Sequence, residues 1–366
     1  MKTLRHPIPF QTSYPTDRLG SKHTLLFFDI ETTGFSGEKN QVYLIGCIYY
    51  DLSKSCWTLL QWFADTPDSE QELLIHFFLF LKDYTKLVHF NGDTFDLPFL
   101  LKRCRHYHLP YDFSPIESID IYRNIRPWKS ALKLPSLKQK SIEQFLGICR
   151  EDQFSGGELI DVYADYLDTK NPDLLKLLIL HNEDDLKGMP QILPILSYPD
   201  LLKQPFSLTD QALYTGPKGQ PVLTLTCQLP FSLPVPFETP GQLPGSQIQG
   251  KDKKLLVFIP LYRGELKYFY PNYQDYYYLP WEDTAIHKSV GEYVTPKARK
   301  KATAKTCYTK KEGLFLPQLK PLSSQIFWES YQGKLAYALY DSALLSDPAA
   351  ADAYIRQLFP VLNTVS

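Results

Sequence analysis

The stretch FFDIETTGFSG (residues 27–37) places two carboxylates at the end of an apolar run. Residues 25–31 are typical of a β-strand, and side chains alternate across a strand. Asp29 and Glu31 therefore share one face, about 6–7 Å apart along the chain. Two like charges beside a core repel each other and lose hydration, and a divalent cation with oxygen ligands compensates both effects. An edge strand that exposes two acids to solvent is the alternative.

The composition narrows the class of protein. The chain has 366 residues with a formal net charge of −1, so its length favours two domains and its charge has to be interpreted locally. No apolar run reaches membrane-spanning length, and MKTLRHPIPFQTSYPTD lacks the apolar segment of a signal peptide. The six cysteines are scattered without a C-x-x-C pair. We therefore expect a cytoplasmic protein with reduced thiols, no membrane partner and no zinc cluster.

The first half of the chain alternates strand-like and helical patterns. Strands are expected at residues 25–31, 41–51, 56–64 and 86–92, and helices at 69–84, 97–107, 141–148 and 173–189. The short turn DLSKS (residues 51–55) predicts an antiparallel hairpin. This half is therefore expected to be an α/β domain.

The composition changes after residue 190. The eleven prolines from Pro190 to Pro244 exclude one long helix and exclude central strands at their own positions. Further strands are expected at residues 221–229, 254–262 and 265–273, with a helix near 343–358. We therefore predict an N-terminal arm (1–22), an α/β domain (23–195), a Pro-rich linker (196–220) and a β-rich C-terminal domain (221–366).

Two more acidic segments follow in the α/β half. HFNGDTFDLPFLLKR places Asp96 between a strand end and a helix, where Asp is also a common N-cap, and Asp93 competes for both roles. LLILHNEDDLKGM places His181 and Asp185 four residues apart, on one helix face. A base one turn from a metal-bound carboxylate suits the activation of water. A solvated acidic turn beside a hydrogen-bonded histidine is the alternative.

Together the motifs DIETTG, NGDTFD and HNEDD resemble those of the DEDD exonuclease superfamily, which has the RNase H-like fold. The sequence is most similar to the YprB-type RNase H-like family of predicted bacterial exonucleases. The similarity covers about residues 24–195 and includes the segments LKLPSLKQKSIEQFLGI and FSGGELIDVYADYL. It implies a mixed central sheet flanked by helices. It also makes Asp96 rather than Asp93, and Asp185 rather than Asp184, the third and fourth acids.

This resemblance implies a metal-dependent 3′–5′ exonuclease with two Mg²⁺ or Mn²⁺ ions. The implied metal ligands are Asp29, Glu31, Asp96 and Asp185. The implied contacts to the terminal nucleotide are Thr32, Thr33, Gly34, Asn91 and Phe95, although the Phe95 ring is equally suited to a core. His181 stands where much of the superfamily has tyrosine. A histidine with a pKa near 6.5 can accept a proton from water, whereas a tyrosine mainly orients it.

The second half combines aromatic and basic residues. Its aromatic residues are Tyr268, Phe269, Tyr270, Tyr273, Tyr276, Tyr277, Tyr278 and Trp281. Residues 288–311 then contain eight Lys/Arg and a single acid, Glu292. Rings that stack on bases and cations that contact phosphates suit single-stranded nucleic acid. Candidate substrate contacts are Lys297, Arg299, Lys300 and Lys301, and the alternative is a β-rich core with one solvated basic face. For Glu282, Asp283 and His287 we expect a structural role rather than a second metal site.

Three functions fit these patterns. The leading one is an exonuclease that acts on a single-stranded 3′ end of DNA or RNA. A non-catalytic nucleic-acid-binding module is disfavoured by the intact set of acids, and a structure-selective endonuclease is the third.

Overall fold

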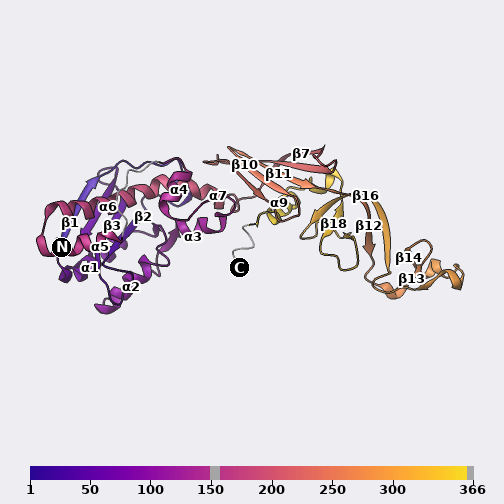
Figure 1. Cartoon of the computed structure of the whole chain (residues 1–366), viewed down its shortest axis with the longest axis horizontal. Helices are drawn as coiled ribbons and strands as arrows, with labels where there is room; N and C mark the ends of the chain where they lie inside the picture. The colour runs from indigo at the N-terminus through magenta and orange to yellow at the C-terminus, as the bar shows by residue number, and fades with distance from the viewer. Residues whose placement is uncertain (149–156, 361–366) are drawn as a thin grey trace. The chain divides into compact units, whose positions relative to one another are not determined.

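The computed structural model describes residues 1–148 and 157–360. The chain divides into two compact units (Figure 1). Unit 1 comprises residues 1–129 and 133–199, and unit 2 comprises residues 130–132 and those from 200 onward. In the described part of the chain, no helix is both long enough and apolar enough to span a membrane. Cys149 and the first three residues of FSGGELIDVYADYL lie outside the described residues.

Unit 1 is built on a six-stranded mixed sheet. In spatial order its strands are β1 (Lys2–Pro7), β4 (Cys56–Phe63), β3 (Val42–Asp51), β2 (Leu25–Thr32), β5 (Lys86–His89) and β6 (Glu117–Asp120). Strands β2, β5 and β6 are parallel, whereas β1, β4, β3 and β2 pair antiparallel. The predicted hairpin is formed by β3 and β4. The α/β prediction for this half is confirmed.

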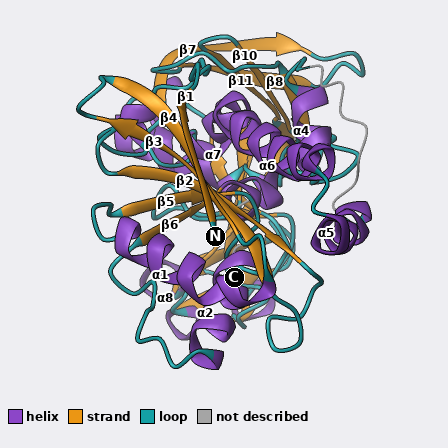
Figure 2. Ribbon diagram, turned by 90° about the vertical axis from the view of Figure 1, so that its left-hand side faces the viewer, coloured by secondary structure: helices purple, strands orange, loops and turns teal. Residues whose placement is uncertain are grey.

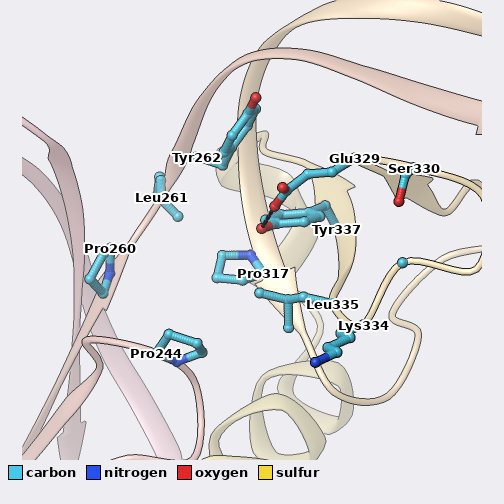
Figure 3. Close-up of a pocket in the computed structure, with 11 residues that line it drawn as sticks. Pro244, Pro260, Leu261, Tyr262, Pro317, Glu329, Ser330, Lys334, Leu335 and Tyr337 are labelled. Carbon is cyan, nitrogen blue, oxygen red and sulfur yellow. Dashed lines mark hydrogen bonds between the residues drawn. The ribbon is translucent and has the colours of Figure 1, made fainter.

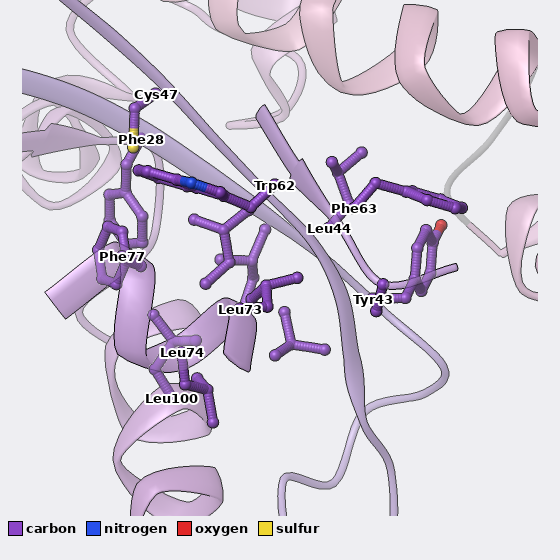
Figure 4. Close-up of a cluster of buried hydrophobic side chains, with 14 of the residues drawn as sticks. Phe28, Tyr43, Leu44, Cys47, Trp62, Phe63, Leu73, Leu74, Phe77 and Leu100 are labelled. Carbon is purple, nitrogen blue, oxygen red and sulfur yellow. The ribbon is translucent and has the colours of Figure 1, made fainter. Parts of the chain in front are cut away.

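Helices cover both faces of this sheet (Figure 2). One face carries α1 (Glu70–Leu81) and α2 (Asp96–His106), and the other carries α6 (Pro172–Ile192) with α5 (Glu158–Thr169) against it. The alternation of β2 directs Phe28 toward α1, where its ring stacks 5.6 Å from that of Phe77 (Figure 4). The same alternation directs Asp29 toward α6. Smaller helices are α3 (Ile121–Ile125) and α4 (Gln139–Phe145).

The first residues of the chain differ from the predicted arm. Residues 2–7 form β1, which pairs antiparallel with β4 at the edge of the sheet. The stretch KTLRHP has no apolar alternation, so its sequence gave no strand signal. The strand is held by backbone pairing and by the ion pair of Arg5 with Asp51, at 3.1 Å.

Unit 2 is β-rich, as predicted. Its largest sheet has the order β7 (Ser207–Thr215), β8 (Pro221–Gln228), β11 (Lys254–Pro260), β10 (Gln247–Lys251) and β9 (Phe237–Pro240). A closed barrel contains β12 (Tyr262–Phe269), β16 (Tyr308–Gln318), β18 (Ala336–Leu339) and β17 (Phe327–Trp328). A small sheet contains β14 (Thr284–His287), β13 (Tyr276–Leu279) and β15 (Lys300–Lys301), next to α8 (Lys288–Gly291). The last described helix is α9 (Pro348–Gln357).

The predicted linker is partly folded, which corrects that prediction. Residues 196–220 contain α7 (Ser197–Asp200) and β7, and β7 pairs with β8 at a sheet edge. Most side chains of β7 are exposed, so the strand lacks the apolar alternation on which sequence prediction depends. Prolines limit only its flanks, at Pro205 and Pro217. Similarly, Pro221 is the first residue of β8 and Pro240 is the last of β9.

Candidate active site

The two acids of the first motif lie on the face of β2 that α6 covers. The Nδ2 amide of Asn182, on α6, donates a hydrogen bond to Asp29 Oδ2 at 2.9 Å. The residue paired with Asp29 on β3 is Gly46. A Cβ at Gly46 would lie 2.0 Å from Asn182 Oδ1, so only glycine leaves room for this amide.

The Asn182 amide is oriented by a second buried amide. Gln61 on β4 donates from Nε2 to Asn182 Oδ1 at 2.9 Å and to the carbonyl of Ile179 at 3.0 Å. Asn182 and Gln61 are both fully buried. Because Oδ1 of Asn182 is an acceptor here, its Nδ2 is the atom that faces Asp29. Sequence reasoning missed Gly46, Gln61 and Asn182, and the only local signal was the asparagine next to the histidine in HNEDD.

The other two acids of the predicted set join Asp29 and Glu31. Asp96 is buried and is the first residue of α2 rather than its N-cap, which is Phe95. Burial raises the pKa of Asp29, and the charges of Glu31, Asp96 and Asp185 raise it further. Burial also raises the pKa of Glu31, followed by the charges of Asp185 and Asp96. The four carboxylates therefore form one electrostatically coupled group.

The pKa of Asp96 shows that the protein itself does little to stabilise a negative charge at this position. Burial raises it from 3.8 to about 7, and the charge of Asp120 adds to the effect. Hydrogen bonds from backbone N–H groups, including that of Ile30, oppose the rise only in part. An ionised carboxylate at this position is therefore unfavourable unless a cation binds nearby.

His181 faces the same group from α6. Its Nε2 atom lies 3.6 Å from Asp185 Oδ2 and 3.9 Å from Glu31 Oε1. The ligand-type atoms of these three side chains all lie within 4.8 Å of one another. Asp184, the neighbouring acid, is exposed instead. The structure thus brings together the histidine and all four acids of the predicted set.

A second polar cluster shapes the loop that leads to Asp96. Asn91 has a positive φ of 64°, and the N–H groups of Asn91 and Asp93 donate to the carboxylate of Asp120 at 3.0 and 3.2 Å. Buried His89 accepts the N–H of Gly92 at Nδ1, at 3.0 Å. His89, Asp93 and Asp120 also have metal-binding atom types close together. Their atoms bind the loop, so we assign them a positioning role.

Asp93 is therefore directed away from the acidic group. Its carboxylate accepts hydrogen bonds from Ser118 Oγ at 2.5 Å and from Arg123 at 2.9 Å. The Asn91 side chain is also used locally, since its Oδ1 accepts from Thr94 Oγ1 at 2.7 Å. A contact of Asn91 with substrate stays a prediction.

The loop after β2 is held by its own polar groups. Thr32 Oγ1 donates to the carbonyl of Gly34 at 2.8 Å, and Thr33 Oγ1 accepts the N–H of Gln41 at 2.9 Å. Gly34 has a φ of +154°, and a Cβ there would lie 2.7 Å from the Asn40 side chain. The two threonines thus fix the loop, and their predicted contacts with substrate are untested.

An exposed ring lies at the tip of this loop. Phe35 is 85% exposed, and its centroid lies 6.4 Å from that of half-buried Phe95, the residue before Asp96. Phe95 in turn lies 5.7 Å from Phe99 of the core. Phe95 therefore has one side in the core and one side beside Phe35. Sequence reasoning missed Phe35, although an aromatic residue directly after Thr-Thr-Gly was the available signal.

Unit 2 contains a cavity of about 550 Å³ with a different character (Figure 3). Its walls include Pro244, Pro260, Tyr262 and Tyr337. Glu329 is the one acid among its lining residues, and it accepts a hydrogen bond from the Tyr337 hydroxyl at 2.7 Å. A single carboxylate that is already hydrogen-bonded cannot form a two-metal site, so the acidic group of unit 1 is the better candidate.

The basic candidates Lys297, Arg299, Lys300 and Lys301 all lie in unit 2. Nearby, Asp283 accepts hydrogen bonds from the hydroxyls of Tyr278 at 2.6 Å and Tyr308 at 2.5 Å, and pairs with Lys310 at 2.5 Å. Asp283 therefore has the structural role that was expected.

Comparisons with known proteins find relatives of the first half of the chain. A family model of the RNase H superfamily matches residues 26–196. The uncharacterized protein YprB of Bacillus subtilis (strain 168) is 33% identical over 177 residues, which cover 46% of this chain and 41% of that protein. DNA polymerase 1 of Aeropyrum pernix is 39% identical over 59 residues, which cover 16% of this chain and 6% of that protein. The chain thus spans less than half the length of these curated relatives.

Two solved structures are also similar. The family B DNA polymerase of Pyrobaculum calidifontis has a TM-score of 0.37 at 13% identity, covering 69% of this chain and 35% of that one. The zinc-bound E. coli ExoI–ssDNA complex has a TM-score of 0.27 at 18% identity, covering 43% of each chain.

Proposed function

Because residues 26–196 form an RNase H-like domain of the YprB type, we propose that this domain is a metal-dependent 3′–5′ exonuclease. Its substrate is DNA or RNA, and the bond hydrolysed is the terminal phosphodiester. The observation that carries the proposal is the coupled group of four carboxylates with a histidine beside it.

The donor set fits divalent cations. Within residues 1–148 and 157–360, no Lys or Arg lies within ion-pair distance of Asp29, Glu31 or Asp96, and their pKa values are raised. Carboxylate oxygens are the ligands that Mg²⁺ and Mn²⁺ prefer. We propose that Asp29, Glu31, Asp96 and Asp185 hold two such ions. When bound, the ions would stabilise the charge on the attacking and leaving oxygens of an in-line displacement.

The protein's own groups then have distinct tasks. Asn182 fixes the orientation of Asp29 through its hydrogen bond to Oδ2. His181 Nε2 faces the acids and orients or deprotonates the attacking water. The exposed ring of Phe35 supports an unpaired 3′ terminus as the substrate, because aromatic rings stack on unpaired bases. We also propose a cytoplasmic location, since the five cysteines that the structure describes are free thiols.

Hydrolysis of 5′-labelled single-stranded DNA and RNA with Mn²⁺ tests this function. We expect a ladder that shortens from the 3′ end and that disappears with a chelator or with D29A/D185A. The matched control is D184A, because Asp184 is exposed on the same helix. Cleavage of a circular single strand would instead indicate an endonuclease. Salt-sensitive binding without cleavage by any form of the protein would indicate a non-catalytic binding module.

A further inference from the structure

The small sheet of unit 2, formed by β14, β13 and β15, carries most of the basic run when the segments between its strands are included. Residues 276–311 contain eight Lys/Arg and three acids, Glu282, Asp283 and Glu292. One of these acids, Asp283, is already paired with Lys310. The segment therefore has a surplus of positive charge in a chain whose formal net charge is −1.

The cations of this sheet divide into two groups. Arg299 donates to the carbonyl of Gly291, and its guanidinium lies 4.5 Å from the centroid of the Tyr277 ring. Arg299 therefore contacts groups of the sheet itself, and its predicted contact with substrate stays a prediction. Lys297, Lys300 and Lys301 are exposed, and no acid among the described residues lies within ion-pair distance of them.

The aromatic residues divide in the same way. Tyr276 stacks on Tyr270 at 4.5 Å, and Tyr278 is hydrogen-bonded to Asp283. Most rings of the predicted aromatic patch are therefore half-buried and in contact with other residues of unit 2. Two rings are different: Trp281 is 78% exposed and Tyr293 is 90% exposed. Tyr293 was not part of the predicted patch.

The two exposed rings, Trp281 and Tyr293, lie near opposite ends of strand β14. Trp281 lies in the turn between β13 and β14, and Tyr293 lies just beyond α8 at the other end of β14. Four strand residues span about 13 Å. Stacked nucleotides rise about 3.4 Å each along one strand, so a few nucleotides bridge this interval. Lys300 and Lys301, on β15, pair with Tyr278 and Tyr277 of the central strand β13, so the two lysines lie at the opposite edge of this three-stranded sheet from β14.

We propose that this surface binds single-stranded nucleic acid. Bases stack on Trp281 and Tyr293, and phosphates contact Lys297, Lys300 and Lys301. The charge surplus calls for a polyanion, and the exposed rings favour one with unpaired bases over an acidic peptide or an anionic membrane. The proposal deepens the proposed function, on which it rests for the choice of nucleic acid.

Binding of fluorescein-labelled dT20 and rU20 to the full chain tests the surface, in chelator so that hydrolysis cannot intervene. For K297Q/K300Q/K301Q, we expect the slope of log K against log salt to fall by about 2, since each phosphate contact on a single strand contributes about 0.7. For W281A/Y293A, we expect affinity to fall at least about thirtyfold with an unchanged slope, because each stacked base contributes roughly 1–3 kcal/mol.

The matched controls are K251Q/K253Q/K254Q and Y214A, which alter exposed residues of the five-stranded sheet in the same unit. Both should bind like the unaltered chain. Equal losses in the matched controls, or unchanged binding in both test variants, would overturn the proposal. So would stronger competition by phosphatidylserine vesicles or polyglutamate than by unlabelled dT20.

Hydrolysis of thymidine 5′-monophosphate p-nitrophenyl ester by the unaltered chain separates the two proposals. If the ester is hydrolysed, the hydrolysis is lost in D29A/D185A and binding is unchanged in the surface variants, the proposed nuclease activity is supported and the proposed binding surface is refuted. If the ester is not hydrolysed and the surface variants show the expected losses of binding, the proposed nuclease activity is refuted and the proposed binding surface is supported.

Discussion

Replacing Asp96 with Asn should stabilise the metal-free protein while abolishing its response to metal. The carboxyl is buried, and its pKa is raised from 3.8 to about 7. A group whose pKa is higher in the folded state contributes full stability only below its unfolded pKa, near pH 4. That contribution is lost as the pH rises through about 7. An amide at this position has no charge to lose and keeps an acceptor for backbone N–H groups.

The size of the effect follows from the pKa. The rise in the pKa of Asp96 from 3.8 to about 7 corresponds to roughly 4 kcal/mol above pH 7, which is the most that removal of the charge can return. We therefore expect D96N to raise the free energy of unfolding of unit 1 by about 1–4 kcal/mol at pH 8. The gain should shrink as the pH is lowered toward 4. For a unit of this size, each kcal/mol raises Tm by about 2–4 °C.

Calorimetry of the full chain in chelator and in Mn²⁺ measures both effects. The transition that Mn²⁺ shifts in the unaltered chain is assigned to unit 1. Saturation at a hundred times Kd should add about 2.7 kcal/mol to the unaltered chain, and D96N should lose this increment. The control is D93N, which should destabilise because the Asp93 carboxylate accepts from Ser118 and Arg123. Destabilisation by D96N at pH 8 in chelator, or a retained response to Mn²⁺, would refute the reasoning.

Three further predictions concern the surroundings of the acids. G46A places a Cβ 2.0 Å from Asn182 Oδ1, so it should lower the free energy of unfolding by roughly 1–3 kcal/mol. Because the clash displaces Asn182, the same substitution should also weaken the stabilisation by Mn²⁺ in calorimetry. An unaltered Mn²⁺ response would contradict the role given to Asn182. H181Q should lower kcat by about 10²–10⁴, because His181 Nε2 faces the acids and is the group proposed to act on the attacking water, and an unchanged kcat would contradict this role. F35A should raise KM for a single-stranded oligonucleotide about five- to a hundredfold with little change in kcat, and a fall in kcat alone would place Phe35 outside ground-state binding.

The sequence predicted best those features that depend only on residues a few positions apart in the chain. The strand alternation that pairs Asp29 with Glu31 and the helical spacing that pairs His181 with Asp185 both depend on a few residues. Those spacings singled out Asp29, Glu31, His181 and Asp185 as candidates, whereas the choice of Asp96 over Asp93 came from the resemblance to the DEDD exonucleases. The edge strands β1 and β7 were missed because their side chains are largely exposed and backbone pairing holds them in place.

The supporting residues could not be predicted for a different reason. Gln61, Asn182 and Gly46 are far apart in sequence and matter only because β4, β3 and α6 meet behind Asp29. The same holds for Asp120, which fixes the loop before Asp96 from a neighbouring strand. Conversely, the run of tyrosines looked like a binding surface from its composition alone. Only the exposed fraction of each side chain in the structure distinguishes the half-buried rings from strongly exposed Trp281 and Tyr293.

These supporting contacts explain how the fold tolerates its acids. Burial and mutual repulsion raise the pKa values of Asp29, Glu31 and Asp96, so ionising them in the absence of metal weakens unit 1. The Asn182 hydrogen bond lowers the pKa of Asp29, but the net shift is still upward. The network therefore holds the carboxylates in place without neutralising them. A rigid group of carboxylates whose charges are not neutralised by the protein interacts most favourably with a bound cation. Across variants of these acids, tighter metal binding should therefore go together with a lower free energy of unfolding in the absence of metal.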